Sequence, residues 1–418
     1  MLKGDRICLL KEFYHSLSRF TEPNSAGFIP KTLEIQLCQK TTTLKTSLGG
    51  SIAIQLSYEQ SKNVLNIQYE RKKGLRMCYW FKGPPGSGKS ICASYICDLF
   101  GKVETGYLCP RKPYKCHLDH QGKCESKVVR NGKDLIAAIQ DMEFIAKKKC
   151  LIVDDVQHID PSPKDLREFM LLAKVKVISL FFFADNIYQN YKSTFATESL
   201  ESTFRGFFLE HKSDLHGIKV LPTIHRNSQK VYSFITSITH DADIVPLDNY
   251  IVGDDVEMRQ VSHLTSEDPN LNGLVHFINE LLAHKSNAHD EECYIYAPSH
   301  ITVLVDGKHA EEDVRLYRRL LRNDPYNAHG ADVYPRQGIT VDLLDDFVGL
   351  DSIVCVFPCR KDTLKSSWLS KLFGRSKQHS LTEEKYRTFL ASRAVIRATF
   401  LTEETFDQST IEVMPVDR

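Results

Sequence analysis

Long hydrophobic runs and an excess of charge of either sign are both missing from this sequence. The longest nearly apolar run, Val177–Ala184, has the length of a buried strand and is far short of the roughly 20 residues that span a membrane. The beginning of the chain, Met1–Arg6, is too charged for a secretory signal peptide. We therefore expect no membrane association and a cytoplasmic or nuclear location, in which the 12 cysteines remain reduced thiols.

The balanced charge leaves the class of partner open, whereas the length predicts several domains. A net charge of +1 neither demands nor excludes nucleic acid, because acidic surface can offset a basic groove. At 418 residues the chain is too long for one ordinary core. From about residue 51, strand-like and helix-like runs alternate, which predicts an α/β fold with parallel sheets. We expect a connector or docking segment for protein partners at 1–50, one lobe at 51–212 and a second lobe at 213–418.

The most informative stretch is a glycine-rich loop that fits the phosphate-binding pattern G-x-x-x-x-G-K-[ST]. A strand-like run at 77–81 precedes it and a helix-like run at 90–100 follows it, which is the context that the motif requires. The glycines let backbone N–H groups turn toward phosphates, and the helix N-terminus adds partial positive charge. Lys89 is expected to reach the β- and γ-phosphates of ATP, and Ser90 to hold Mg²⁺. The loop consists of Gly83, Pro84, Pro85, Gly86, Ser87, Gly88, Lys89 and Ser90.

A second apolar run ends in two aspartates at a separation that suits the same nucleotide-binding lobe. Cys150–Val153 is followed by Asp154, which is expected to hold Mg²⁺ through water. The next residue, Asp155, is placed to orient or deprotonate the attacking water. The alternative is a strand that ends in a solvated acidic turn. The phosphate-binding loop upstream favours the catalytic interpretation.

Three further segments resemble motifs of superfamily 1 helicases. Asp154–Gln157 resembles the Asp-Glu-x-Gln motif. Ser179–Gln189 resembles the strand and Gly-Asp-x-x-Gln motif that couple the ATP site to the nucleic-acid track, with Ala184 in place of the glycine. Leu56–Gln60 resembles the glutamine motif that reads adenine, although a random surface glutamine fits nearly as well. The resemblance implies a role in contacting or sensing the nucleotide for Gln60, Gln157, Asp185 and Gln189.

The second half of the chain resembles the later motifs of this class in the same order. Leu221–Asn227 resembles Leu-x-x-x-Tyr-Arg-Ser, and a strand at 301–306 with a helix from about 311 follows. The run 341–354 resembles the motif in which Gly-Leu-Glu precedes a buried strand, and Phe389–Ala394 resembles the final motif. The residues implied at the nucleotide are Arg226, Gly349, Asp351 and Arg393. The two arginines would approach the γ-phosphate from across the cleft, because a guanidinium offers fixed, bidentate donors.

The full set resembles the UvrD/Rep branch, and more closely the C-terminal helicase-like domain of the long Schlafen proteins. Only 114 positions separate Arg226 from Thr340 (340 − 226), which leaves no room for the large subdomains inserted in UvrD and Rep. The likeness covers about residues 55–405. It implies two tandem RecA-like lobes, with Mg²⁺ and ATP in the cleft between them and RNA or single-stranded DNA as partner. We expect no nuclease activity, because about 50 residues before the first lobe are too few for the family's ribonuclease domain.

Two departures from these motifs bear on catalysis. Asp155 stands where glutamate is usual, and a side chain one methylene shorter can move a base off its water by about 1 Å, which can matter ~10²-fold. Ala184 adds a Cβ where glycine permits close backbone approach. Both favour the alternative to an ATP-hydrolysing motor or switch, which is a catalytically weak, nucleotide-binding scaffold.

Three other segments carry weaker signals. The first, at 107–124, holds clustered thiols and imidazoles without a C-x-x-C knuckle. Ordinary reduced cysteines are therefore a stronger interpretation than a zinc site. The same stretch is basic and carries Tyr107 and Tyr114, which suits a single-stranded nucleic acid about as well as a solvated loop. The run 315–322 has arginines at helical spacing and predicts an amphipathic surface helix. The basic, serine-rich run 365–377 fits an exposed insertion better than a nucleic-acid loop. The candidate zinc ligands are Cys109, Cys116, His117, His120 and Cys124.

Overall fold

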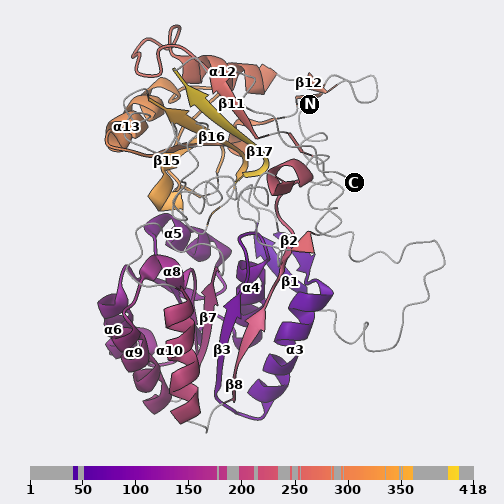
Figure 1. Ribbon diagram of the computed structural model, residues 1–418, viewed down its shortest axis with the longest axis vertical. Helices are drawn as coiled ribbons and strands as arrows, with labels where there is room; N and C mark the ends of the chain where they lie inside the picture. The colour runs from indigo at the N-terminus through magenta and orange to yellow at the C-terminus, as the bar shows by residue number, and fades with distance from the viewer. Residues whose placement is uncertain are drawn as a thin grey trace, which may run out of the picture.

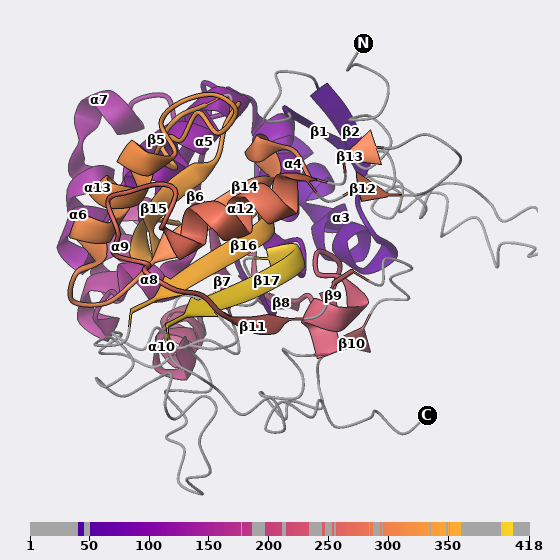
Figure 2. The same cartoon turned by 90° about the horizontal axis from the view of Figure 1, so that it is seen from above.

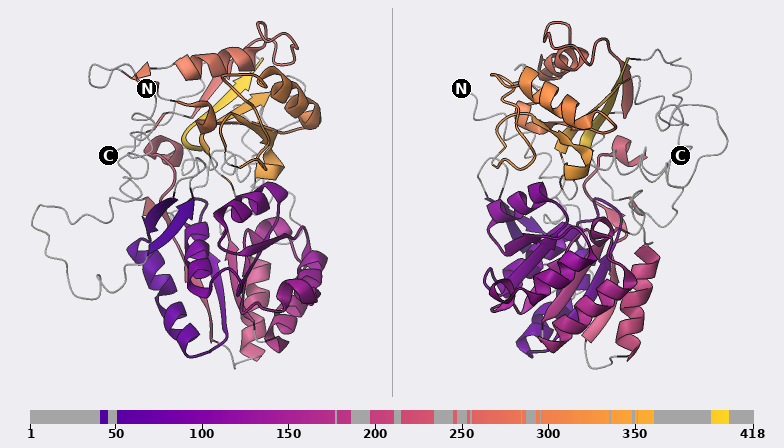
Figure 3. Two further views of the ribbon diagram at one scale, coloured as in Figure 1. Left: turned by 180° about the vertical axis from the view of Figure 1, so that it is seen from behind. Right: turned by 90° about the vertical axis from the view of Figure 1, so that its left-hand side faces the viewer.

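The structure is a computed structural model with two sheets of parallel strands, each flanked by helices (Figure 1). This arrangement confirms the predicted α/β fold with two tandem RecA-like lobes. Figure 3 shows the two lobes as separate bodies, one above the other, from behind and from the side. The structure describes residues 41–45, 51–176, 178–185, 197–210, 215–233, 245–246, 253–254, 256–283, 285–286, 293–294, 296–334, 336–347, 350, 352–360 and 394–403.

The first sheet has six strands in the order β5-β4-β6-β7-β3-β8, and all neighbours are parallel. Strands β3, β4, β6 and β7 are buried almost throughout, which explains why they read as continuous apolar runs. The strand that precedes the phosphate-binding loop is therefore separated from the strand that precedes the two aspartates by β7. The strands are β3 (Met77–Lys82), β4 (Thr105–Cys109), β5 (Glu125–Val128), β6 (Cys150–Val153), β7 (Ser179–Ala184) and β8 (Leu215–Val220).

Alternate side chains of the central strands fill the core on the two faces of this sheet. Trp80 on β3 stacks on Phe182 of β7, with ring centroids 5.4 Å apart, and belongs to the core under α9 and α10. On the other face, Phe81 stacks on Phe183 at 4.8 Å, beneath α4. The helices of this lobe are α3 (Tyr58–Lys72), α4 (Lys89–Phe100), α5 (Lys112–Gln121), α6 (Gly132–Gln140), α7 (Met142–Ile145), α8 (Val156–Ile159), α9 (Pro163–Val175) and α10 (Thr197–Glu210).

Strand β8 extends the first sheet beyond the predicted boundary at 212. It pairs in parallel with β3 along its full length, from Leu215 opposite Met77 to Val220 opposite Lys82. The first sheet therefore ends at Val220. The chain leaves β8 beside the phosphate-binding loop, since the Leu221 backbone N–H donates to the Lys82 carbonyl oxygen at 2.8 Å.

The second sheet has five strands in the order β11-β17-β16-β14-β15, and all its pairs are parallel. Helices α12 and α13 pack on it through Phe277, Ile278, Val314 and Tyr317, and both are seen from above in Figure 2. The elements of this lobe are β11 (Glu257–Gln260), α12 (Gly273–Ala283), η2 (Pro298–His300), β14 (Ile301–Val305), α13 (Ala310–Leu320), β15 (Thr340–Leu343), η3 (Leu344–Phe347), β16 (Ser352–Cys359) and β17 (Ala394–Thr402).

Three short strand pairs lie outside these sheets, namely β1 (Thr41–Lys45) with β2 (Ser51–Gln55), β9 (Thr223–Ile224) with β10 (Val245–Pro246), and β12 (Lys285–Ser286) with β13 (Cys293–Tyr294). The predicted connector at 1–50 is described only at β1, which lies against α4. The described helices include none that is both long and apolar enough to cross a membrane.

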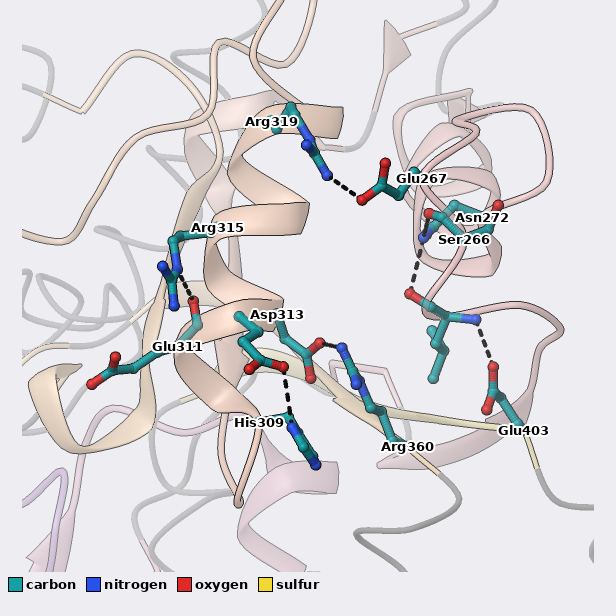
Figure 4. A network of polar contacts seen from close by, with 12 residues as sticks. Ser266, Glu267, Asn272, His309, Glu311, Asp313, Arg315, Arg319, Arg360 and Glu403 are labelled. Carbon is teal, nitrogen blue, oxygen red and sulfur yellow. Dashed lines mark hydrogen bonds and ion pairs between the residues drawn. The ribbon is translucent and has the colours of Figure 1, made fainter.

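Helix α13 confirms the expected amphipathic surface helix. Figure 4 shows Arg315 and Arg319 of this helix engaged within the second lobe. Arg319 pairs with Glu267 at 2.9 Å, and the Arg315 Nε donates to the Glu311 carbonyl oxygen at 3.1 Å. Arg318 pairs with Asp342 at 3.1 Å. These contacts give the arginines a structural role on the surface of the lobe.

Candidate nucleotide site

The phosphate-binding loop connects β3 to α4 and has the backbone shape that its glycines predict. Gly86 and Gly88 have φ values of 82° and 84°, in the left-handed region that side chains rarely adopt. A Cβ added to Gly88 would lie 2.0 Å from the Gln60 Nε2, and one added to Gly86 would lie 2.9 Å from the Asn227 Oδ1. The loop thus needs glycine at both positions.

Lys89 is buried at the start of α4 and is held by oxygen atoms. Its Nζ donates to the carbonyl oxygens of Gly83 at 2.8 Å and Pro84 at 2.9 Å. It also forms a buried ion pair with the Oδ1 of Asp185, which follows β7. The Lys89 ammonium therefore lies over the loop and contacts the carboxylate of Asp185, at the end of the neighbouring strand β7.

Gln157 connects Asp185 to Asp155, so that three predicted residues form one buried chain with Lys89. The Gln157 Oε1 accepts from the Asp185 backbone N–H at 3.2 Å. Its Nε2 donates to the Asp155 Oδ1 at 3.1 Å and to the Asp185 Oδ2 at 3.3 Å. Asp155 has a φ of 50° at the N-cap of α8, an uncommon conformation for a residue with a side chain. The sequence placed these residues near one another, and the structure adds the hydrogen bonds that join them.

Asp154 is fully buried at the end of β6, with both carboxylate oxygens engaged. The Oδ2 accepts from the Tyr107 hydroxyl at 2.5 Å and from the Tyr114 hydroxyl at 2.6 Å, and the Oδ1 accepts from the Asp155 backbone N–H at 2.9 Å. Burial and the adjacent Asp155 raise the pKa of Asp154 to about 6, although the hydrogen bonds from both tyrosines act in the opposite direction. Burial also raises the pKa of each tyrosine well above its usual value.

Tyr107 and Tyr114 are the site residues that sequence reasoning misplaced. The sequence suited a nucleic-acid contact or a solvated loop about equally well for this segment, but both tyrosines are buried against Asp154. The basic side chains around them are paired with carboxylates rather than gathered on an open track. The pairs, with N–O distances of 2.5–2.9 Å, are Lys112–Asp332, Lys115–Asp119, Lys123–Asp98 and Lys127–Asp141. The tyrosines could have been suspected from their position, since Tyr107 lies in an apolar strand that neighbours β6.

Gln60 lies against the phosphate-binding loop. It belongs to a capping box at the start of α3, in which the Ser57 backbone N–H donates to its Oε1 at 2.9 Å. Its Nε2 donates to the Ser87 carbonyl oxygen at 3.0 Å. The predicted glutamine motif is therefore in direct contact with the loop, and the amide of Gln60 fixes the loop backbone.

The segment after β8 brings Arg226 to the same loop. The His225 backbone N–H donates to the Gly86 carbonyl oxygen at 2.9 Å, and the Arg226 Cβ lies 3.2 Å from the place of a Cβ on Gly86. The Asn227 Nδ2 donates at 2.6 Å to the carbonyl oxygen of Ala394, the first residue of β17. Burial lowers the pKa of His225 to about 4, so its imidazole is neutral at pH 7. A strand of the second sheet is thus tied to the phosphate-binding loop through one short segment.

Four predicted site residues, Gln189, Gly349, Asp351 and Arg393, lie outside the described residues. The residues weighed as zinc ligands and judged the weaker interpretation are described, and they form no group suited to a metal ion within the described chain, namely Cys109, Cys116, His117, His120 and Cys124. Cys109, Cys116 and Cys124 are free thiols, in agreement with the expectation of reduced cysteines.

The residues present fit a phosphate group and Mg²⁺. The Ser87 Oγ is fully buried and has no hydrogen-bond partner among the described residues, so the loop offers an unused polar group beside its backbone N–H groups. The Ser90 hydroxyl and the Asp154 carboxylate supply the hard oxygen donors that Mg²⁺ prefers. Lys89 would contact phosphate oxygens, and these two oxygen ligands would lie at the metal.

The chain has distant likenesses among solved structures. No protein-family model and no curated protein matches the sequence. Among solved structures, the chain is similar to the crystal structure of the Arterivirus nonstructural protein 10 helicase, with 11% identity over 86% of this chain and 67% of that chain and a TM-score of 0.33. A complex of Arterivirus nonstructural protein 10 with DNA matches with 11% identity over 96% and 81% of the two chains and a TM-score of 0.31. The two-lobed fold rests on the strand order and parallel pairing described above, and the Schlafen resemblance stays a prediction.

Proposed function

We propose that this chain is a helicase-like ATPase of superfamily 1, a motor or switch of Schlafen type that acts on RNA or single-stranded DNA. The observation that carries the proposal is the buried chain from Lys89 through Asp185 and Gln157 to Asp155. It joins the lysine of the phosphate-binding loop to the residue placed at the attacking water. A change at the γ-phosphate would therefore change hydrogen bonds at the ends of two neighbouring strands.

Each residue of this chain has a defined part in the proposed hydrolysis. Lys89 would exchange its bond to Asp185 for oxygens of the β- and γ-phosphates, as the loop backbone surrounds them. Asp154 would hold Mg²⁺ through water, and the metal ion would neutralise charge on the phosphates. Asp155 would accept a hydrogen bond from the attacking water and take its proton. Gln157 would hold the Asp155 carboxylate in place and report the state of Lys89 through Asp185.

The second lobe would complete the charge balance on closure. Arg226 belongs to the segment that contacts Gly86, and Arg393 immediately precedes Ala394 in the sequence, whose carbonyl oxygen bonds Asn227. Two guanidinium groups near the γ-phosphate would stabilise charge that develops in the transition state. Closure of the lobes would then depend on the bound nucleotide, which is the property that a motor or switch requires.

The first test is Mg·ATP hydrolysis by the purified chain, with and without single-stranded RNA and DNA. We expect turnover that nucleic acid stimulates, and the better stimulator identifies the track. Lys89→Ala should lose nucleotide binding, because the ammonium is the main positive group at the loop. Arg393→Ala should retain binding and lose hydrolysis. Normal hydrolysis by Arg393→Ala would refute the two-lobe mechanism.

The second candidate is a nucleotide-binding scaffold that does not turn over ATP. Asp155 in place of glutamate and Ala184 in place of glycine favour it, as does the left-handed backbone of Asp155, which fixes where a short carboxylate can reach. Tight ATP binding without turnover, in the presence of either nucleic acid, would support the scaffold. Asp155→Glu is then the informative variant, since recovery of turnover would attribute the loss to the missing methylene.

A further inference from the structure

The hydroxyl of Tyr114 lies between the two side chains that are placed to hold Mg²⁺. It donates to the Asp154 Oδ2 at 2.6 Å, and its oxygen lies 3.5 Å from the Ser90 Oγ. Tyr114 is on α5, whereas Ser90 lies in the first turn of α4 and Asp154 follows β6, so three separate elements meet at this hydroxyl. The phenol ring is buried, which holds the hydroxyl in this position.

These distances match the place of a metal-bound water. In octahedral coordination by oxygen at about 2.1 Å, two adjacent ligands of Mg²⁺ lie about 3 Å apart. A water on a metal ion held by the Ser90 hydroxyl would therefore lie close to where the Tyr114 oxygen is found. From there it would donate to Asp154, as the Tyr114 hydroxyl does. A phenol oxygen and the water cannot both occupy that position.

We propose that Tyr114 caps the Mg²⁺ position, and that binding of Mg²⁺ with nucleotide displaces its hydroxyl and moves α5. This inference rests on the proposed function, because it assumes the same nucleotide site. It makes Tyr114 a positioning residue of that site. It also gives binding of Mg²⁺ and nucleotide in the first lobe a means of changing contacts with the second lobe.

Helix α5 is the element that would carry this movement, because it contacts the second lobe. The Lys112 Nζ pairs with Asp332 at 2.9 Å. The imidazole rings of His117 and His120 lie against the ring of Tyr334, with centroids 5.3 and 5.6 Å apart. His117 also stacks on Tyr114 itself, at 6.2 Å and an interplanar angle of 18°. A continuous set of ring contacts therefore leads from the metal position to the second lobe.

Tyr107 provides a matched comparison within the same site. Its hydroxyl donates to the same Asp154 oxygen at 2.5 Å, and it too is buried. It lies on β4, inside the sheet, and its oxygen is also 3.0 Å from the Tyr114 hydroxyl oxygen. Loss of its hydroxyl removes a hydrogen bond from Asp154 and a neighbour of the Tyr114 hydroxyl, but it leaves the Tyr114 oxygen in place beside Ser90.

The test is the Mg²⁺ dependence of nucleotide binding by the full chain, measured with a fluorescent ATP analogue over a range of free Mg²⁺. For Tyr114→Phe we expect half-maximal binding at about tenfold lower free Mg²⁺ than for wild type, because a charge-assisted hydrogen bond no longer has to be broken. For Tyr107→Phe we expect no such fall. An unchanged or higher Mg²⁺ requirement in Tyr114→Phe would overturn the proposal, and so would an equal fall in both variants.

A second measurement follows α5 directly and does not depend on turnover. Hydrogen exchange of the wild-type backbone amides at 112–121 should become faster when Mg²⁺ and a non-hydrolysable ATP analogue are added, and Tyr114→Phe should show this faster exchange already without them. Unchanged exchange on addition would contradict the displacement of α5. Lys89→Ala distinguishes a failure of this inference from a failure of the proposed function. If Lys89→Ala bound nucleotide as tightly as wild type, the phosphate-binding loop would not be the nucleotide site, and the proposed function would fail.

Discussion

Replacement of Asp185 by asparagine tests the buried ion pair at the centre of the site. Asp185 accepts from the Lys89 Nζ through Oδ1 and from the Gln157 Nε2 through Oδ2. Gln157 cannot turn its amide to adapt, because its Oε1 already accepts from the Asp185 backbone N–H at 3.2 Å. In either orientation of the new amide, its NH₂ group faces another donor, which is Lys89 or Gln157.

The magnitude follows from burial. Lys89 is 7% exposed and Asp185 is 2% exposed, and removal of one partner of a buried pair costs about 3–5 kcal/mol. Lys89 keeps the carbonyl oxygens of Gly83 and Pro84, so the low end of this range is expected. About 3 kcal/mol lowers the melting temperature of a lobe of this size by about 6–12 °C. Bound nucleotide should restore more stability to Asp185→Asn than to wild type, because phosphate oxygens replace the lost carboxylate.

The assay is thermal unfolding with and without Mg²⁺ and a non-hydrolysable ATP analogue. Glu210→Gln is a suitable control, because its ion pair with Arg167 is on the surface, with side chains 55% and 46% exposed. Surface pairs contribute about 0–1 kcal/mol, so this variant should melt close to wild type. The reasoning is refuted if Asp185→Asn melts within about 2 °C of wild type, or if nucleotide stabilises it less than it stabilises wild type.

Two further predictions concern pH and the loop backbone. Burial and Asp155 raise the pKa of Asp154 to about 6, so folding takes up a proton in the pH window below that value. As pH rises through this window, the free energy of unfolding should fall more in wild type than in Asp154→Asn, and equal pH dependence in denaturant unfolding of the two proteins would contradict this. Gly88 has a φ of 84°, and a Cβ added there would lie 2.0 Å from the Gln60 Nε2. Gly88→Ala should therefore lower the free energy of unfolding by about 1–2 kcal/mol and lose affinity for nucleotide. Gly206→Ala, where nothing lies within 4 Å, is its control and should be neutral or stabilising in calorimetry, whereas equal losses in both variants would argue against the loop geometry.

Local signals in the sequence were sufficient for the phosphate-binding loop and its flanking elements. The strand before the loop, the helix after it and the strand before Asp154 were all predicted within a residue or two, because each combines an apolar run with a short motif. The chain that joins Lys89, Asp185 and Gln157 was anticipated as a grouping. Its hydrogen bonds depend on the order of strands in the sheet, and strand order is a long-range property that no local pattern encodes.

The same reason explains what sequence reasoning missed. Tyr107 and Tyr114 stand among lysines in the sequence, and a basic, aromatic segment is typical of nucleic-acid contact. Their actual partner, Asp154, is 40 or more positions away; Tyr107 meets it because β4 lies beside β6 in the sheet, and Tyr114 meets it from α5, the helix that follows β4. Strand β8 is a similar case, since its pairing with β3 joins residues more than 130 positions apart.

The charges of the site give a reason for nucleotide and metal to bind together. Lys89, Asp154, Asp155 and Asp185 are all less than 9% exposed, so three carboxyl groups share one ammonium in the interior. Uncompensated buried charge is costly, and the raised pKa of Asp154 is one response to it. Bound phosphate without a metal ion would draw Lys89 away from Asp185 and place more negative charge beside the three carboxyl groups. If the proposed site holds, a divalent cation at Ser90 and Asp154 would offset both effects, and the carboxylates would then disfavour free nucleotide and favour the nucleotide with its metal.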